Sequence, residues 1–157
     1  MSGRGCQGSR RGLTVMDLII PAALVGVIAV FGLRQVGQAR QSVREELALQ
    51  NLRTLGTACR WYRQATSTYP DSLLRLGLPD SDPPYVPSVL ALREPVRQGY
   101  VFTYRSAAGG FEVQADPTEH GGTGRRHFLI DQTLAVRSTT EDRFATPADP
   151  VFPTEPR

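Results

Sequence analysis

The sequence predicts an α+β fold in which one long N-terminal helix packs on a small antiparallel β-sheet. Two observations carry this prediction. In the first part of the chain, apolar residues recur every three or four positions, which is typical of a helix with one buried face. In the second part, short segments of alternating apolar and polar residues are separated by glycine-rich stretches, which is typical of antiparallel strands joined by turns.

The chain begins with a short basic segment, residues 1–12, followed by an apolar segment, residues 13–33. As a helix the apolar segment would be roughly 31 Å long, close to the ~30 Å hydrocarbon core of a bilayer. Asp17 is its single charged residue, and a carboxylate costs about 2.5–3.5 kcal/mol at the centre of a membrane. We therefore expect a transmembrane helix over 13–33 in which Asp17 has a specific role.

This N-terminal region resembles that of type IV prepilins and of the pseudopilins of type II secretion systems. In that family a specialised peptidase cleaves after a glycine, the new N-terminal amine is methylated, and an acidic residue stands fifth in the mature chain. The resemblance implies cleavage after Gly12, N-methylation of Leu13 and a role in assembly for Asp17. The chain departs from the family pattern in having Asp instead of the usual Glu, and Arg34 where many members have proline.

The resemblance implies a pilin-like fold and a non-enzymatic structural subunit that polymerises with copies of itself or with other pilins or pseudopilins. The implied partners are the prepilin peptidase and an inner-membrane assembly platform. The implied location is the bacterial inner membrane, crossed once with the C-terminal domain in the periplasm or outside, and later an extracytoplasmic filament. Whether that filament is a surface pilus, a DNA-uptake fibre or a secretion pseudopilus stays open, as does the choice between major and minor subunit.

Two other classes of protein remain as alternatives. One is a periplasmic binding domain that is anchored by a single membrane span and never polymerises. The other is an enzyme whose site the sequence does not reveal. The mass of the mature N-terminus discriminates between these classes, because only a pilin-type subunit would lose residues 1–12 and gain a methyl group.

The charge of the chain gives no indication of nucleic-acid binding. The sequence has 18 basic residues, 15 acidic residues and a formal net charge of +3. Three of the arginines lie in residues 1–12, so cleavage after Gly12 would leave equal numbers of basic and acidic side chains. Because a balanced charge does not attract a polyanion, we expect no nucleic-acid partner for the mature subunit.

The helical pattern continues past the apolar segment. From Val36 to Tyr62, apolar residues recur mostly at three- or four-residue spacing, with arginines and glutamates between them. This pattern predicts an amphipathic continuation of the helix over 34–66. Cys59 falls on the apolar side, and the second cysteine, Cys6, belongs to the leader. We therefore expect Cys59 to be a buried packing thiol; a disulfide between subunits is the alternative.

Residues 67–137 are predicted to form a globular α+β head. A short helical turn is expected at Ser72–Leu76, and the proline-rich residues 77–99 are expected to be irregular. The patterns predict an antiparallel meander of strands at Tyr100–Tyr104, Phe111–Ala115, His127–Ile130 and Leu134–Val136. Residues 138–157 contain four prolines and little to bury, which predicts a flexible tail.

The sequence predicts neither a catalytic constellation nor a cofactor. Asp116, Glu119 and His120 lie close together in a predicted loop and are weak candidates for holding a cation, because carboxylates and imidazoles are metal ligands. Acidic residues in a polar turn are usually solvated, so we expect no metal site. His127 and Asp131 share a strand face but would lie about 13 Å apart, too far to ligate one ion.

Overall fold

The computed structural model describes residues 15–107 and 109–153, and within the first helix it describes side chains at Ile19 and from Gly37 onward. The chain divides into two compact units, Met1–Gln38 and Ala39–Arg157. The elements in chain order are α1 (Val15–Thr66), the 3-10 helix η1 (Leu73–Leu76), β1 (Val96–Arg97), β2 (Tyr100–Ala107), β3 (Gly110–Pro117), β4 (His127–Asp131) and β5 (Val136–Thr139). The α+β composition therefore agrees with the prediction.

The prediction of a transmembrane half within the long helix is wrong. Among the described residues, no helix combines the length and the apolar character needed to cross a membrane. The charged side chains that recur from Arg40 to Arg63 are costly in hydrocarbon, which excludes a membrane span over that part of α1. The predicted single-pass location in the bacterial inner membrane, with the C-terminal domain outside, depended on a span at 13–33 and is corrected with it.

The C-terminal part of α1 buries one of its faces against the sheet. Leu52, Leu55 and Cys59 are fully buried, and their spacing of three and four residues places them on one side of the helix. Trp61, on another side, is half exposed. The expectation that Cys59 is a packing thiol is confirmed, because it is free and buried and burial raises the pKa of its thiol to about 12.

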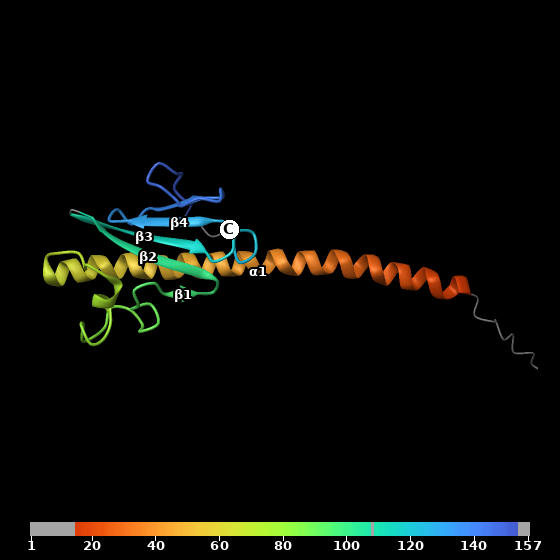
Figure 1. Ribbon diagram of the computed structural model, residues 1–157, viewed down its shortest axis with the longest axis horizontal. Helices are drawn as coiled ribbons and strands as arrows, with labels where there is room; N and C mark the ends of the chain where they lie inside the picture. Colours follow the sequence, from red (N-terminus) through yellow and green to blue (C-terminus); the bar gives the residue numbers. More distant parts are fainter. Residues whose placement is uncertain (1–14, 108, 154–157) are drawn as a thin grey trace, which may run out of the picture. The chain divides into compact units, whose positions relative to one another are not determined.

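The five strands form an antiparallel meander in the order β1-β2-β3-β4-β5, and β2, β3 and β4 lie side by side next to the C-terminal part of α1 (Figure 1). In the registers, Phe102 faces Ala115 and Val113 faces Ile130, so buried side chains line up across the sheet. These residues join the buried face of α1 in one core. Its largest fully buried side chains include Tyr100, Phe102, Phe111 and Phe128.

The strand predictions hold for the centre of the sheet and differ at its edges. The segments predicted at Tyr100–Tyr104, Phe111–Ala115 and His127–Ile130 lie within β2, β3 and β4. The last predicted strand, Leu134–Val136, is displaced: Leu134 has φ 62 and its N–H donates to the carbonyl of Asp131 at 2.9 Å. Leu134 therefore belongs to a turn, and β5 begins only at Val136.

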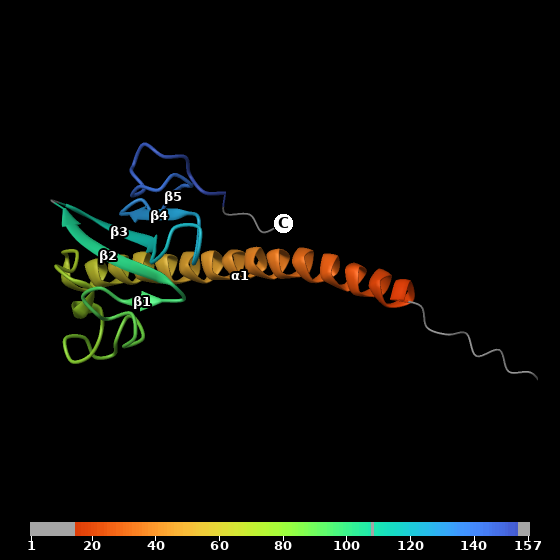
Figure 2. The same cartoon turned by 45° about the vertical axis from the view of Figure 1, so that its right-hand side comes forward.

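The C-terminal segment (residues 140–153) packs on the sheet, which differs from the flexible tail expected for residues 138–157. Val151 forms an antiparallel bridge with Arg137, and the N–H of Phe152 donates to the carbonyl of Val136 at 2.7 Å. The Phe152 ring meets Phe128 edge-on, with centroids 5.7 Å apart. Figure 2 shows this segment looping above β5. Prolines end regular structure, but they do not prevent such docking.

An ion pair fixes the loop within the C-terminal segment. Arg143 Nη2 lies 2.6 Å from Asp149 Oδ1, and the N–H of Thr146 donates to Asp149 Oδ2 at 2.7 Å. These donors hold the pKa of the Asp149 carboxyl far below its usual range, the hydrogen bond from Arg143 contributing most. The carboxylate is therefore the charged form around which this loop is ordered.

Candidate functional site

The strongest cluster of ligand-type side chains in the described residues begins with a carboxylate–imidazole pair on neighbouring strands. His127 is the first residue of β4, and Asp116 lies near the end of β3. Ala115 faces Phe128 in the register, so the next step along both strands places Asp116 opposite His127. Asp116 Oδ1 lies 2.7 Å from His127 Nδ1, and both side chains are largely buried.

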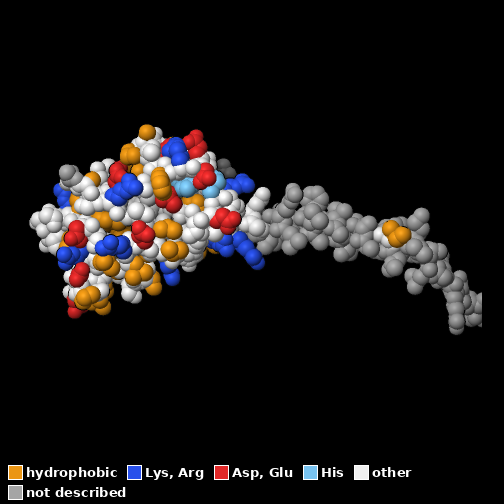
Figure 3. All heavy atoms as spheres, in the orientation of Figure 1, with side chains coloured by type: hydrophobic (Ala, Val, Ile, Leu, Met, Phe, Trp, Pro, Cys, Tyr) orange, Lys and Arg blue, Asp and Glu red, His pale blue; other side chains and the backbone are white. Residues whose placement is uncertain are grey.

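Two residues from other segments complete this group, which we call the histidine cluster: Asp116, His120, His127 and Asp142. His120, in the β3–β4 loop (residues 118–126), has its Nδ1 3.4 Å from His127 Nε2, and the two rings lie 5.5 Å apart at an angle of 18°. Asp142, in the C-terminal segment, has its Oδ1 3.9 Å from each of these nitrogens. In Figure 3 histidine atoms (pale blue) are visible on the surface of the head beside acidic side chains.

Burial and neighbouring charge both act on the Asp116 carboxyl of the cluster. Burial raises the pKa of the Asp116 carboxyl, while the hydrogen bond and charge of His127 and the charge of Arg105 act in the opposite direction. A carboxylate at 2.7 Å accepts the Nδ1–H of the imidazole. In the tautomer that carries this proton, the lone pair of the ring is on Nε2, which faces His120 and Asp142.

One ligand atom from each of His120, His127 and Asp142 lies within 4.8 Å of the other two. Two imidazole nitrogens and one carboxylate oxygen at such separations are a ligand set for a transition metal ion. As acid–base groups alone they could also exchange protons. In the described residues, no side chain of the cluster contacts a serine or cysteine nucleophile, so the geometry does not indicate covalent catalysis.

The sequence located only part of this cluster. Of the three weak metal candidates, Asp116 and His120 belong to it, whereas the Glu119 side chain does not. Asp131, on the same strand as His127, is predicted to be too far away to share an ion with it. The partner of His127 is Asp116, which lies across the sheet and which the β3–β4 hairpin register places opposite it. No local sequence signal points to Asp142, which the docking of the C-terminal segment brings to the cluster.

The predicted processing and assembly residues cannot be placed in the same way. Gly12 and Leu13 lie outside the described residues. Asp17 falls within α1, but its side chain is not among those described. Cleavage after Gly12, methylation of Leu13 and the assembly role of Asp17 therefore stay predictions.

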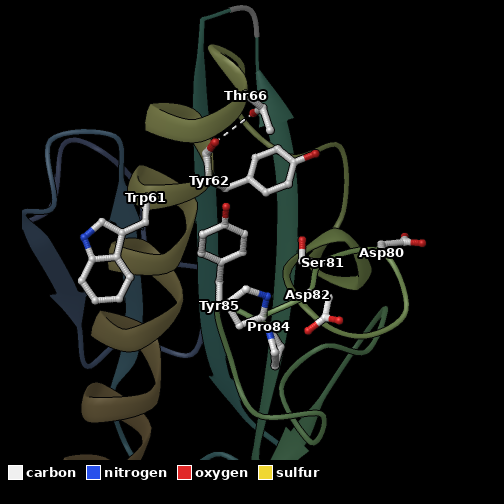
Figure 4. A pocket seen from close by; sticks show the side chains of 9 residues that line it. Trp61, Tyr62, Thr66, Asp80, Ser81, Asp82, Pro84 and Tyr85 are labelled. Carbon is white, nitrogen blue, oxygen red and sulfur yellow. Dashed lines mark hydrogen bonds between the residues drawn. The ribbon is translucent and has the colours of Figure 1, made fainter.

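An open pocket of about 430 Å³ lies between α1 and the irregular segment before β1. Tyr62 and Tyr85 meet edge-on in it, with ring centroids 5.8 Å apart. Figure 4 shows Trp61 and Asp80 pointing away from these rings. Because its polar groups do not converge on one point, the pocket offers aromatic contact surface and no arrangement typical of catalysis.

Comparison with known proteins adds no assignment: no protein-family model, curated protein or solved structure matches this chain.

Proposed function

We propose that this protein is a structural subunit of a filament of the type IV pilin or pseudopilin kind. The observation that carries the proposal is α1, a single helix of 52 residues, which begins close to the Gly12–Leu13 junction and ends beneath an antiparallel sheet. The sequence places the junction, the acidic residue Asp17 and the apolar segment in the order found in pilins. An enzymatic role is not part of the proposal.

The two halves of α1 have different tasks in this proposal. The C-terminal half of α1 buries its apolar face within its own subunit, since Leu49, Leu52 and Leu55 lie in the core of the head. The apolar residues of 13–33 remain for contacts between copies of the chain. Burial of apolar surface between subunits, at about 25 cal/mol per Å², supplies the cohesion of the filament.

Asp17 selects the register of the filament. Cleavage after Gly12 exposes the amine of Leu13, and we propose that this cation pairs with Asp17 of a neighbouring subunit. Desolvating the two charges offsets much of their attraction, but an unpaired carboxylate among apolar helices is worse. The pair therefore favours one stagger of the helices over others. The partners in this step are other pilin-type subunits, with the prepilin peptidase and the assembly platform acting before it.

The first test is the mature N-terminus. The full chain is co-expressed with a prepilin peptidase and its intact mass is measured. Loss of residues 1–12 with gain of one methyl group is expected, and a Gly12→Leu variant should keep its leader. An unprocessed wild-type chain, or cleavage at another bond, would contradict the proposal.

The second test is polymerisation, followed by electron microscopy of sheared filaments. Asp17→Ala should be processed normally but assemble poorly. Asp17→Glu is the matched control, because it keeps the charge and restores the acid that the pilin family usually has. Equal assembly of Asp17→Ala and wild type would refute the role of Asp17, and a processed wild-type chain that never polymerises would favour a binding domain.

A further inference from the structure

We propose that His120, His127 and Asp142 form a binding site for a zinc-like divalent transition metal ion, with Asp116 orienting one of the ligands. The site is independent of the proposed filament role. It joins the β3–β4 loop to the C-terminal segment, two parts of the chain that are separate in sequence.

The separations of the three ligand atoms fit this class of metal. In a tetrahedral zinc site with bonds of about 2.0–2.1 Å, neighbouring ligand atoms lie about 3.3–3.4 Å apart. The His127 Nε2 and His120 Nδ1 atoms are 3.4 Å apart. Asp142 Oδ1 is 3.9 Å from both nitrogens, and its side chain is 78% exposed, so a small rotation can bring it to ligand distance.

Asp116 orients the imidazole ring of His127 for binding a metal ion. Its Oδ1 lies 2.7 Å from His127 Nδ1, and when Nδ1 carries the proton and donates it to this carboxylate, the lone pair of the ring is on Nε2. Carboxylate–histidine–metal arrangements of this kind orient the ring and increase its basicity. Because the His127 side chain is only 8% exposed and Asp116 only 13%, solvent has little access to this hydrogen bond.

The segments that carry the other two ligands are already ordered. In the β3–β4 loop, the N–H of Gly121 donates to the carbonyl of Gly124 at 2.7 Å, and Gln41 of α1 donates to the carbonyls of Gly121 and Gly122. Asp142 precedes Arg143, which is held by Asp149. A metal ion would therefore meet ligands whose backbone needs little further ordering, which lowers the cost of binding.

The ligand types decide the class of ion. Two imidazole nitrogens with one carboxylate suit zinc and its neighbours, whereas Ca²⁺ and Mg²⁺ prefer oxygen ligands. Three protein ligands leave a fourth position for water or for a group from a partner molecule.

The experiment uses the full chain with Cys6→Ser, because a leader thiol could itself bind zinc. The protein is treated with a chelator, dialysed and titrated with Zn²⁺ by calorimetry near neutral pH, and Co²⁺ serves as a spectroscopic probe of coordination. We expect one ion per chain. His120→Ala should abolish binding, and Asp142→Asn should weaken it at least tenfold. These two side chains are exposed by 30% and 78%, so their replacement should leave the fold intact, as checked by circular dichroism.

Two further variants separate a metal site from general charge effects. Asp116→Asn should weaken binding about 10- to 100-fold, as is usual for a group that orients a metal-bound histidine. Glu119→Gln is the matched control: it removes an acid next to His120 that lies outside the cluster, and it should bind as the parent does. Zn²⁺ should also slow tryptic cleavage after Arg125 and Arg126 in the parent but not in His120→Ala.

The proposal is overturned if the parent takes up no Zn²⁺, which would leave His120 and His127 as a hydrogen-bonded pair only. It is also overturned if His120→Ala binds as tightly as the parent, or if Glu119→Gln weakens binding as much as Asp142→Asn. None of these results bears on filament assembly, so the site and the filament role fail separately.

Discussion

Replacing Gly56 by alanine tests the contact between α1 and β4. An added Cβ would lie 2.7 Å from Ile130 Cδ1 and 3.2 Å from Leu134 Cδ2, whereas carbon atoms in good contact are about 3.5–4.0 Å apart. Ile130 is 1% exposed, so its side chain has little room to withdraw. Overpacking of a core costs about 1–3 kcal/mol, and the better helix propensity of alanine returns about 1 kcal/mol. We expect a net destabilisation of about 0–2 kcal/mol, where the propensity alone would give a stabilisation of about 1 kcal/mol.

The rescue for this variant is Ile130→Val, which removes the Cδ1 methyl that the new Cβ would meet. Alone, Ile130→Val should cost about 0.5–1.5 kcal/mol. In the Gly56→Ala background it should cost less or become stabilising, which gives a coupling energy of about 1 kcal/mol. Urea unfolding of the full chain, followed by far-UV circular dichroism, measures all four members of this double-mutant cycle.

The control is Gly37→Ala, where an added Cβ meets nothing within 4 Å and only the helix propensity should act. If Gly56→Ala is as harmless as Gly37→Ala, or if Gly56→Ala and Ile130→Val are additive, then α1 does not lie on β4 as described and the reasoning is refuted.

Three further predictions concern single side chains. Burial raises the pKa of Cys59 to about 12. In a Cys6→Ser chain, a thiol reagent at mildly alkaline pH should therefore label Cys59 slowly until denaturant is added. Rapid labelling of the native chain would contradict the burial of Cys59. The folded pKa of Asp149 is depressed, so the stabilisation that its carboxylate gives the folded chain is complete above the unfolded pKa of about 3.9 and is lost on further acidification. Wild type should therefore lose thermal stability in acid more steeply than Asp149→Asn. Parallel pH profiles of the two chains would exclude a stabilising role for the Asp149 carboxylate. Tyr104→Phe removes the hydrogen bond to the Pro70 carbonyl and should cost about 0.5–1.5 kcal/mol in urea unfolding; no change would mean that water replaces the hydroxyl.

The sequence predicts the centre of this fold well because the patterns there are local. Alternation in Phe111–Ala115 identifies the strand face that joins the core, and the three- and four-residue spacing from Leu52 to Cys59 identifies the buried helix face. The burial of Gln114 on the opposite face of the strand is not predicted, because it depends on the distant Ala145, whose carbonyl accepts from the Gln114 amide. The edges depend on tertiary contacts. β1 has two residues, too few to show a period, and β5 is set by the turn at Leu134 and by the docking of Phe152.

The prediction of a membrane span is wrong and the prediction of the histidine cluster is incomplete, for different reasons. The span was inferred from the length and composition of residues 13–33, whereas the described part of α1 is too polar for any such window. The cluster requires the β3–β4 register for His127 and Asp116, which a hairpin pattern could supply. It also requires the return of the C-terminal segment to bring in Asp142, and no periodicity encodes that return.

The ends of the sheet have a consequence for crowded copies of this chain. β1 has only two residues and directly follows Pro95, which has no N–H to donate. At the opposite end of the sheet, Val151 forms a bridge with Arg137 of β5, and the N–H of Phe152 donates to the carbonyl of Val136. Open strand edges invite pairing with other molecules, and short or covered edges discourage it. Heads held at high local concentration should therefore stay separate folded bodies and resist conversion into amyloid-like aggregates.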